Sequence, residues 1–248
     1  MARIDLNCDL GEGAGHDPEL MPLISSASIA CGGHAGDERT MLAAVELART
    51  HRVALGAHPG FNDPGTFGRQ ERPVWPDEVF QLVLHQTRAL QRIAGGRGIA
   101  LAHVKPHGAL YNMASRNSVL ADAVAQAVYE VDPRLRLFGL AGGCLIRAAE
   151  KCGLVAVSEV FADRTYQPDG SLTPRAERGA VVGEADAAVR QAVALVCEGH
   201  IVAVDGTRVA VRAESICLHG DGDHAVEFAR KLRERLRLEG VEIRAPDA

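Results

Sequence analysis

The segment HVKPHGALYN, at positions 103–112, holds the densest group of chemically active side chains in this sequence. His103, Lys105 and His107 occupy alternate positions, so all three face the same way if the stretch is extended. Lys105 is one of only three lysines, against 24 arginines, and a compact ammonium suits a phosphate charge or a tunable proton donor. Histidine exchanges a proton near neutral pH. We therefore predict catalytic roles for His103, Lys105 and His107, and substrate contacts for Tyr111 and Asn112.

A second candidate segment, DLNCDLGEG, covers positions 5–13. Strand alternation places Asp5, Asn7 and Asp9 on one face, which is the inward face if the intervening leucines pack outward. Buried carboxylates are costly unless they are paired, protonated or bound to a metal or substrate. Glu12 and two glycines follow directly, as a loop over a ligand requires. We predict catalytic roles for Asp9 and Glu12 and a substrate contact for Asn7. The alternative is a polar network that fixes the first strand, and Asp5 belongs either to the site or to the core.

Two glycine-rich segments carry further histidines, CGGHAGD at 31–37 and GAHPGF at 56–61. Their glycines allow close backbone approach, and helix N-termini at strand ends favour anions such as carboxylate or phosphate. We predict substrate contacts for His34, Asp37 and His58. In the alternative interpretation, Asp37 only caps the following helix and His34 only occupies a turn.

The segments FADRTY, at 161–166, and CLHGD, at 217–221, complete the set. Asp163 and Arg164 form either a structural ion pair or the wall of a pocket for an anionic substrate. His219 and Asp221 suit a ligand loop, although the carboxylate also suits the start of the following helix. We predict substrate contacts for all four residues.

Several common catalytic motifs are absent from the sequence. It has no G-x-x-x-x-G-K-[ST] phosphate loop, no G-x-S-x-G nucleophile elbow and no H-E-x-x-H zinc motif. Dispersed histidines and aspartates can still assemble a metal site, for which Asp9, His34 and His58 are candidates. The sequence leaves open whether a metal binds.

The elements that must position these residues follow from the hydrophobic pattern, in which short apolar runs alternate with longer segments of helical period. The predicted strands span residues 4–8, 28–30, 53–57, 99–104, 136–140, 155–160 and 215–218. The predicted helices span residues 40–50, 77–93, 118–130, 145–152, 184–197 and 224–238. This alternation predicts a parallel sheet covered by helices, either closed or doubly wound. The carboxyl ends of such strands converge, and the candidates above lie near those ends.

Residues 201–211 interrupt the alternation just before the last strand. Two apolar runs flank Asp205 and Gly206, which predicts a small β-hairpin with a two-residue turn. No repeat, low-complexity tract or linker divides the chain. We therefore predict a single domain over residues 1–248 with a hairpin insertion.

Composition narrows the class of protein further. The 248 residues carry a formal charge of −5, with 47% hydrophobic and 24% charged residues, which is typical of a globular domain. The mild acidity predicts no nucleic-acid partner, and no apolar run is long enough to predict a membrane span. Six scattered cysteines and the absence of a signal-peptide pattern favour reduced thiols in the cytoplasm.

The candidate segments closely resemble the LamB/YcsF family. The matching stretches are DLNCDLGEG, SIACGGHAGD, GAHPGF, HVKPHGALYN, FADRTY and CLHGD, in the family's order and spread over nearly the whole chain. Two departures are Ser28, where the family usually has Asn, and Gly33, where it usually has a larger residue, often Phe. Neither departure removes an acid, base or charge, so we expect activity to survive.

The resemblance implies a (β/α)7 TIM-like barrel of the glycoside hydrolase/deacetylase type. It also implies a 5-oxoprolinase, a cyclic amide hydrolase that opens 5-oxo-L-proline to L-glutamate while ATP, with Mg2+, is hydrolysed to ADP and phosphate. The family's activity needs two further subunits, B and C, so we expect this chain to be one component of a complex. Nucleotide would then bind in an unfamiliar pocket or at a shared interface, in keeping with the missing phosphate loop.

This chemistry suggests roles for the candidates. A five-membered lactam is a poor electrophile, and phosphorylation of its amide oxygen would activate it. We expect Lys105 and the His34 loop to neutralise phosphate charge, and Arg164 to hold the substrate carboxylate. Proton transfer would involve His107 or His103 as donor to the ring nitrogen and a nearby carboxylate, Asp9 or Glu12, as base towards water.

Two alternatives belong to other functional classes. A metal-dependent amidohydrolase or deacetylase would need bound metal and no ATP. A non-catalytic subunit would only bind the lactam and deliver it to B and C. The concentration of titratable groups at the strand ends argues against simple delivery, since a delivery pocket needs fewer acids and bases.

Overall fold

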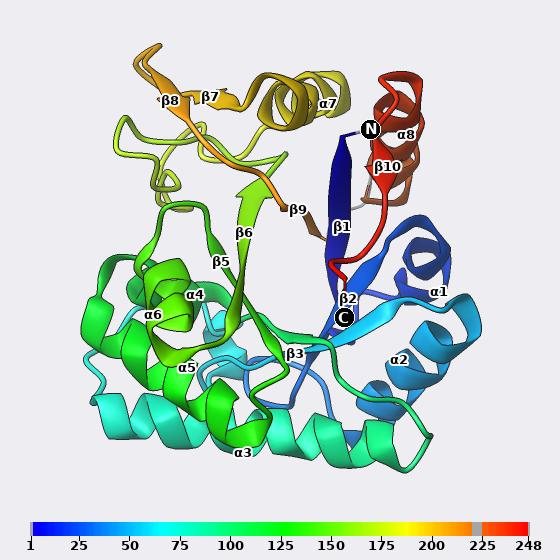
Figure 1. Ribbon diagram of the computed structural model, residues 1–248, viewed down its shortest axis with the longest axis vertical. Coiled ribbons are helices and arrows are strands. Elements are labelled where there is room, and N and C mark those ends of the chain that lie inside the picture. The colour runs from blue at the N-terminus through cyan, green and yellow to red at the C-terminus, as the bar shows by residue number, and fades with distance from the viewer. Residues whose placement is uncertain (1, 220–224, 248) are drawn as a thin grey trace.

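Seven parallel strands close into a barrel in the computed structural model, which describes residues 2–219 and 225–247 (Figure 1). The first strand, β1, pairs with both β2 and β9, and the strands between them complete the ring. A short extra strand, β10 (Glu242–Ile243), pairs with the start of β1. The barrel strands are β1 (Arg3–Leu10), β2 (Ser26–Ala30), β3 (Ala54–His58), β4 (His103–Val104), β5 (Arg136–Leu140), β6 (Val155–Phe161) and β9 (Ser215–His219). The sheet is therefore closed rather than doubly wound.

Helices cover the outside of the barrel. They are α1 (Asp17–Leu20), α2 (Glu38–His51), α3 (Pro76–Gly95), α4 (Gly108–Arg116), α5 (Ser118–Val131), α6 (Cys144–Cys152), α7 (Ala185–Val193) and α8 (Ala225–Leu238), with short 3-10 turns at Met21–Leu23 and Pro64–Thr66 and a π turn at Ala194–Glu198. In Figure 1, α3 runs along the bottom, with α5 and α6 on the left and α2 on the right. Apolar side chains at helical spacing in α3, such as Val79, Val83 and Leu90, are fully buried against the barrel. Within the described residues, no helix is both long and apolar enough to span a membrane.

The predicted strands and helices are confirmed to within two residues at most of their ends. The short elements α1 and β10 were not predicted, α7 gives way to a π turn at Ala194, and two regions near the site differ. The strand predicted over 99–104 is confined to β4, because residues 96–98 form a turn after α3 and the amide of Ile99 still donates to the carbonyl of Ala94 in that helix. The sequence interpretation also missed α4, which begins directly after His107 at Gly108, a residue with a φ of +54°. The sequence pattern had suggested an extended chain only over 103–107 and assigned no element to the residues of α4.

The predicted hairpin is present just before the last barrel strand, as β7 (His200–Val202) and β8 (Arg208–Ala210). The two-residue turn is wrong by one residue. The amide of Ala203 donates to the carbonyl of Thr207 at 2.8 Å, so three residues lie in the turn. The last of them, Gly206, has a φ of +88°, which glycine adopts without strain.

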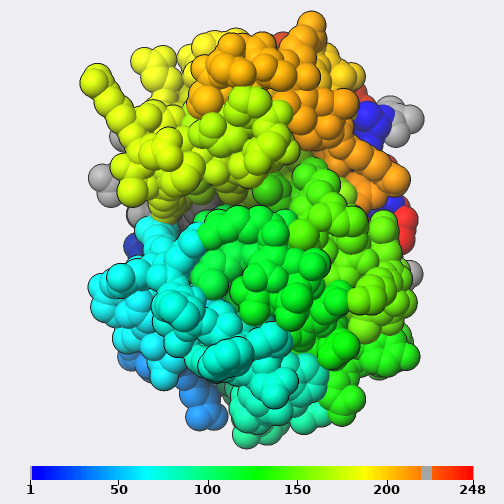
Figure 2. Space-filling model, turned by 90° about the vertical axis from the view of Figure 1, so that its left-hand side faces the viewer, coloured from blue at the N-terminus to red at the C-terminus, as the bar shows by residue number. Residues whose placement is uncertain are grey.

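The connection from β6 to α7, residues 162–184, folds over the carboxyl end of the barrel. Figure 2 shows this segment in yellow, with the hairpin in orange, above the cyan and green helices. Arg164 fastens the connection from within, since its guanidinium donates to the carbonyls of Thr173 at 2.6 Å and Ala180 at 3.1 Å. The side chain of Gln191 in α7 adds hydrogen bonds to three further carbonyls of the same segment and the end of β6.

The barrel interior needs a glycine at one position. His103 of β4 is buried inside the barrel, where it stacks on Phe138 with ring centroids 4.4 Å apart. The neighbouring strand β3 makes room with Gly56, since a Cβ at that position would lie 2.1 Å from Nε2 of His103. A ring on one strand and a glycine on the next thus fill one layer of the barrel.

We expect Gly56→Ala to lower the free energy of unfolding by about 1–3 kcal/mol, because an added methyl group overpacks this layer. Urea denaturation followed by circular dichroism measures the change. Gly95→Ala is the matched control, since a Cβ there meets no atom within 4 Å and its φ is not positive. Equal stability of Gly56→Ala and Gly95→Ala would contradict this account of the barrel interior.

Candidate functional site

A buried ammonium group lies at the centre of the polar residues in the barrel. The Nζ of Lys105 is 2.6 Å from Oδ1 of Asp9, 3.1 Å from Oε1 of Glu159 and 2.8 Å from Oδ1 of Asn7. It also approaches the Sγ of Cys217 at 3.2 Å. Burial alone would lower the pKa of Lys105, but the charges around it, foremost that of Asp9, raise it well above the usual range. The side chain is therefore a cation that neutralises buried carboxylates.

The first strand lines this interior as alternation predicted. Asn7 donates to Oε1 of Glu159 at 2.8 Å and to the hydroxyl of Ser215 at 2.7 Å. Asp5 lies one layer lower and accepts hydrogen bonds from the hydroxyls of Ser25, Ser26 and Ser215. The open question about Asp5 is thus answered, because it belongs to the polar core below the cluster. Asn7 likewise supports Lys105 and lines neither of the cavities described below.

Three histidines and a glutamate meet beside the ammonium, from the ends of β1 to β4. Nε2 of His58 is 3.0 Å from Nδ1 of His107 and 3.3 Å from Oδ2 of Asp9. Oε1 of Glu12 is 3.0 Å from Nε2 of His34 and 3.5 Å from Nδ1 of His107. The rings of His34 and His107 stack with centroids 3.5 Å apart. These atoms of Glu12, His34, His58 and His107 all lie within 4.8 Å of one another, the spacing of a possible metal site.

Backbone carbonyls fix the orientation of two of these rings. Nδ1 of His58 lies 2.7 Å from the carbonyl oxygen of Lys105, and Nε2 of His107 lies 2.8 Å from that of Phe67. Burial lowers the pKa of His34 to about 4 and that of His107 well below the usual range, the latter with help from His58 and His34. The rings of His34 and His107 are therefore neutral at physiological pH.

The cluster opens into a cavity of about 260 Å³. Its walls include Asp9, Glu12, His58, Lys105, His107, Tyr111, Asn112, Glu159 and Arg164. Burial, aided by the charge of Glu159, raises the pKa of Tyr111 well above the usual range, so its hydroxyl keeps its proton and can donate. Most of the residues predicted for the site thus meet around one small cavity.

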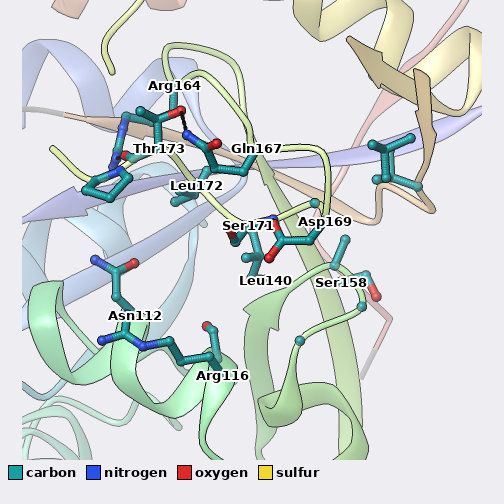
Figure 3. Close-up of a pocket in the computed structure, with 18 of the residues that line it drawn as sticks. Asn112, Arg116, Leu140, Ser158, Arg164, Gln167, Asp169, Ser171, Leu172 and Thr173 are labelled. Atoms are coloured by element: carbon teal, nitrogen blue, oxygen red, sulfur yellow. Dashed lines mark hydrogen bonds between the residues drawn. The ribbon is translucent and has the colours of Figure 1, made fainter. Parts of the chain in front are cut away.

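A second cavity, of about 680 Å³, adjoins the first on the outside. Figure 3 shows it between Asn112 and Arg116 of α4 and the loop that carries Arg164, Gln167 and Ser171. The two cavities share five wall residues, which are Glu71, Asn112, Arg164, Leu172 and Pro174. The inner cavity therefore lies next to a larger space that the β6–α7 connection covers.

The structure does not bring every predicted residue to the cavity. Asp37 is exposed and caps α2 by accepting from the amide of Thr40, as the alternative interpretation expected, and it does not line the cavities. His103 lies deeper in the barrel, 3.1 Å from the hydroxyl of Ser28, and lines neither cavity. His34 does not line the cavity either. It lies behind the wall, where it contacts Glu12 through Nε2 and stacks on His107.

The remaining predicted residues have mixed outcomes. Arg164 is part of the pocket wall, and its guanidinium holds the loop carbonyls already described. Asp163 is half-buried beside it and does not line the cavities. His219 ends β9, where its backbone pairs with that of Asp9, and Asp221 lies outside the described residues.

Sequence reasoning missed Glu159 and Cys217, which both touch the Lys105 ammonium. Glu159 is fully buried on β6 and precedes the quoted FADRTY motif by only two residues. A carboxylate inside an otherwise apolar strand was the signal that could have identified it as a candidate. Cys217 gave no comparable signal, because a buried cysteine is ordinarily a packing residue.

The two departures from the family pattern have local explanations. The hydroxyl of Ser28 forms a hydrogen bond with Nε2 of His103 inside the barrel. At Gly33, a Cβ would lie 2.5 Å from the carbonyl oxygen of Gly60 and 2.6 Å from Nε2 of Gln86. Gln86 occupies that space and forms two hydrogen bonds with the backbone of Gly60. A larger residue at position 33 therefore requires Gln86 to move.

Fold and site together define a seven-stranded TIM-like barrel of the deacetylase and glycoside hydrolase type, with its polar cluster at the carboxyl ends of the strands. The LamB/YcsF family model matches residues 4–248, and the chain belongs to that family. It is 51% identical over 249 residues to the A subunit of 5-oxoprolinase from Geobacillus thermodenitrificans, covering 99% of this chain and 97% of that one. Identity to the corresponding 5-oxoprolinase protein of Staphylococcus carnosus is 50%, with 97% and 98% covered.

Solved structures agree with this assignment. The crystal structure of a lactam utilization protein from Thermus thermophilus superimposes with a TM-score of 0.91 at 46% identity, covering 98% of this chain and 100% of that one. A more distant likeness, to the T48 deacetylase, has a TM-score of 0.52 at 13% identity over 98% of this chain and 87% of that one. That second likeness shows the barrel fold alone.

We expect Lys105→Met to lower the free energy of unfolding by about 3–5 kcal/mol, because it leaves Asp9 and Glu159 as buried charges without their cation. Chemical denaturation measures the loss. The control is Lys151→Met, which breaks an ion pair of 2.6 Å with Asp122 on a lysine side chain that is 72% exposed. An exposed pair of this kind contributes about 0–1 kcal/mol. Losses of equal size would contradict the role assigned to Lys105.

The pH dependence of stability tests the polar core below the cluster. Burial raises the pKa of Asp5 to about 6, although hydrogen bonds from Ser215, Ser25 and Ser26 act in the opposite direction. A carboxyl whose pKa is raised on folding stabilises the protein below its unfolded pKa, and this contribution is lost as pH rises through 6.

The free energy of unfolding of wild type, relative to Asp5→Asn, should thus fall by up to about 3 kcal/mol between pH 4 and 7. Both proteins are denatured with urea across this range, so that titrations common to the two cancel. A difference that stays constant with pH would refute the raised pKa of Asp5.

Proposed function

We propose that this chain is the A component of an ATP-dependent 5-oxoprolinase, which opens 5-oxo-L-proline to L-glutamate together with subunits B and C. The observation that carries the proposal is the small cavity at the barrel end, where a buried Lys105 ammonium lies between the carboxylates of Asp9 and Glu159. The names of the relatives, which are 5-oxoprolinase components and a lactam utilization protein, supply the substrate class.

The chemistry of a lactam explains why such a cavity needs a fixed cation. ATP phosphorylates the oxygen of the ring carbonyl and is released as ADP, which places phosphate charge beside the ring carbon that water then attacks. A preorganised ammonium, held in a water-poor site, stabilises developing negative charge strongly. Lys105 supplies it at the floor of the cavity. Asp9, bonded to Lys105 and part of the cavity wall, accepts a proton of the attacking water and returns it to the ring nitrogen as the carbon–nitrogen bond breaks, which leaves an acyl phosphate. A second water then cleaves this acyl phosphate to L-glutamate and phosphate.

The structure argues against the donor roles expected for two histidines. His103 does not reach the cavity. Nε2 of His107 faces the Phe67 carbonyl and can only donate to it, while burial keeps the ring neutral. His107 therefore has no proton to give towards the substrate. Asp9 and Glu12, two of the carboxylates in the cavity wall, are the better placed proton acceptors.

The substrate carboxylate needs a cation at the mouth of the cavity. Arg164, the residue expected for this role, uses two nitrogens to hold loop carbonyls. Arg175 lines the same cavity from the β6–α7 connection and is half-buried there. We assign the substrate carboxylate to Arg175, with Arg164 fixing the loop that presents it.

Nucleotide use is assigned to the assembled complex, with Mg2+ accompanying ATP. The inner cavity, at about 260 Å³, is below the range typical of drug-sized ligands, so it suits a lactam rather than a nucleotide. The outer cavity is larger and includes Arg116 and Arg212 in its walls. We propose that this outer space faces the partner subunits and passes activated lactam inward.

The histidine cluster favours a second candidate function. Glu12 and its three histidine neighbours have the spacing of a metal site, which a metal-dependent amidohydrolase acting without ATP would use. The two functions differ in one observable. Only the second produces glutamate from 5-oxo-L-proline in the absence of ATP.

Reconstitution separates these possibilities. Release of glutamate and ADP is measured from 5-oxo-L-proline and ATP, first with the purified chain alone and then with subunits B and C. We expect both products only in the mixture. ATP-independent glutamate release by the chain alone would support the metal-dependent amidohydrolase. An assembled mixture with no turnover would refute the proposed substrate.

Within the active mixture, we expect Asp9→Asn to lower kcat by about 100-fold or more, the range attributed to general acid–base groups. KM should change much less, because the other walls of the cavity are intact. Asp37→Asn is the control, since Asn caps a helix as well as Asp does and the side chain is exposed. Full activity of Asp9→Asn, or an equal loss in Asp37→Asn, would contradict the assignment.

A further inference from the structure

Two imidazole nitrogens, from His58 and His107, face each other in the cluster. A carbonyl oxygen can only accept a hydrogen bond, so Nδ1 of His58, opposite the Lys105 carbonyl, and Nε2 of His107, opposite the Phe67 carbonyl, both carry hydrogen. The second nitrogens of these rings, Nε2 of His58 and Nδ1 of His107, lie 3.0 Å apart, and Oδ2 of Asp9 is 3.3 Å from Nε2 of His58. Both nitrogens thus point at one position, as two imidazole ligands of a single metal ion do.

A third electron-rich atom points to the same place. Oε1 of Glu12 is 3.5 Å from Nδ1 of His107 and 4.0 Å from Nε2 of His58. Ligands bound tetrahedrally at roughly 2.0–2.1 Å are separated by about 3.3 Å from one another. The three separations, from 3.0 to 4.0 Å, are distributed around that value.

The surroundings also match those of a metal site. Metal-binding histidines usually donate their second N–H to a carbonyl or carboxylate, which orients the ring. Both His58 and His107 do so here. Nε2 of His34 lies 3.0 Å from Glu12 and orients its carboxylate in the same way. Because His34 uses this nitrogen and stacks flat on His107, it supports the ligand set rather than joining it.

We propose that Glu12, His58 and His107 bind one divalent transition-metal ion of the Zn2+ class. Two imidazoles and one carboxylate suit such ions, and three protein ligands leave a coordination position open. All three residues line the inner cavity, so that position faces the substrate space. A metal there would act as a Lewis acid towards an oxygen of the ligand. The inference does not rest on the proposed function, because binding is measured without turnover.

The test uses the full, untagged chain after removal of metals with a chelator. Zn2+ is titrated calorimetrically, and Co2+ is added separately to record the visible absorption of a low-symmetry nitrogen–oxygen site. We expect one equivalent of Zn2+ to bind with a Kd on the order of micromolar or tighter, and Co2+ to give absorption bands that Zn2+ abolishes. A wild-type chain that binds no Zn2+ under these conditions would overturn the proposal and leave a shared proton between the two rings.

Variants locate the site. His58→Gln and His107→Gln should each weaken Zn2+ binding by at least about 100-fold, and His34→Gln by about 10–100-fold, as for residues that orient a ligand. His85→Gln, on the exposed surface of α3, should bind as wild type does. Circular dichroism shows whether each variant is folded. If His58→Gln or His107→Gln is unfolded, the Zn2+ affinity of His34→Gln provides the test instead. Unchanged affinity in the folded cluster variants would overturn the assignment.

Discussion

The ion pair of Lys105 with Asp9 and Glu159 is the interaction on which the site depends. A parallel barrel of this size is normally filled with branched apolar side chains, whereas here the upper layers hold a lysine, two carboxylates and an amide. Removing charges from water is expensive, and the mutual neutralisation and hydrogen bonds of these groups offset that cost. Asp9 lies on β1, Glu159 lies on β6 and Lys105 directly follows β4. The three charges therefore come together only when the barrel closes.

This central pair also sets the properties of the groups around it. Asp9 joins the ammonium on one side to the imidazole of His58 on the other, which couples the charged interior to the histidine cluster. Burial lowers the pKa of His107 well below the usual range, and one nitrogen each of His58 and His107 donates to the carbonyls of Lys105 and Phe67. The cavity therefore combines a fixed cation with several electron-rich atoms. Such a site suits charge stabilisation and proton acceptance more than proton donation.

Much of the architecture could be predicted from the sequence, because each strand and helix has a clear period and each site motif follows a strand. Alternation correctly placed Asp5, Asn7 and Asp9 inside the barrel. It could not tell how deep each lies, since depth depends on strand stagger, and so Asp5 and His103 proved to be core residues. The sequence could not decide between the two interpretations of Asp37, which caps α2, because capping and ligand binding use the same residue types. Glu159 was missed because its partner, Lys105, is distant in sequence.

The charge state of Lys105 is the most direct test of this account. Nitrogen NMR of the lysine side chains is practicable, because the chain has only three lysines and Lys151 and Lys231 are exposed. A Lys105→Arg or Lys105→Met sample identifies the resonance of Lys105. At a pH of about 10.4, where an ordinary lysine is half titrated, Lys105 should remain fully protonated. A Lys105 resonance that titrates at or below that pH would show that the barrel is not organised around a buried ammonium.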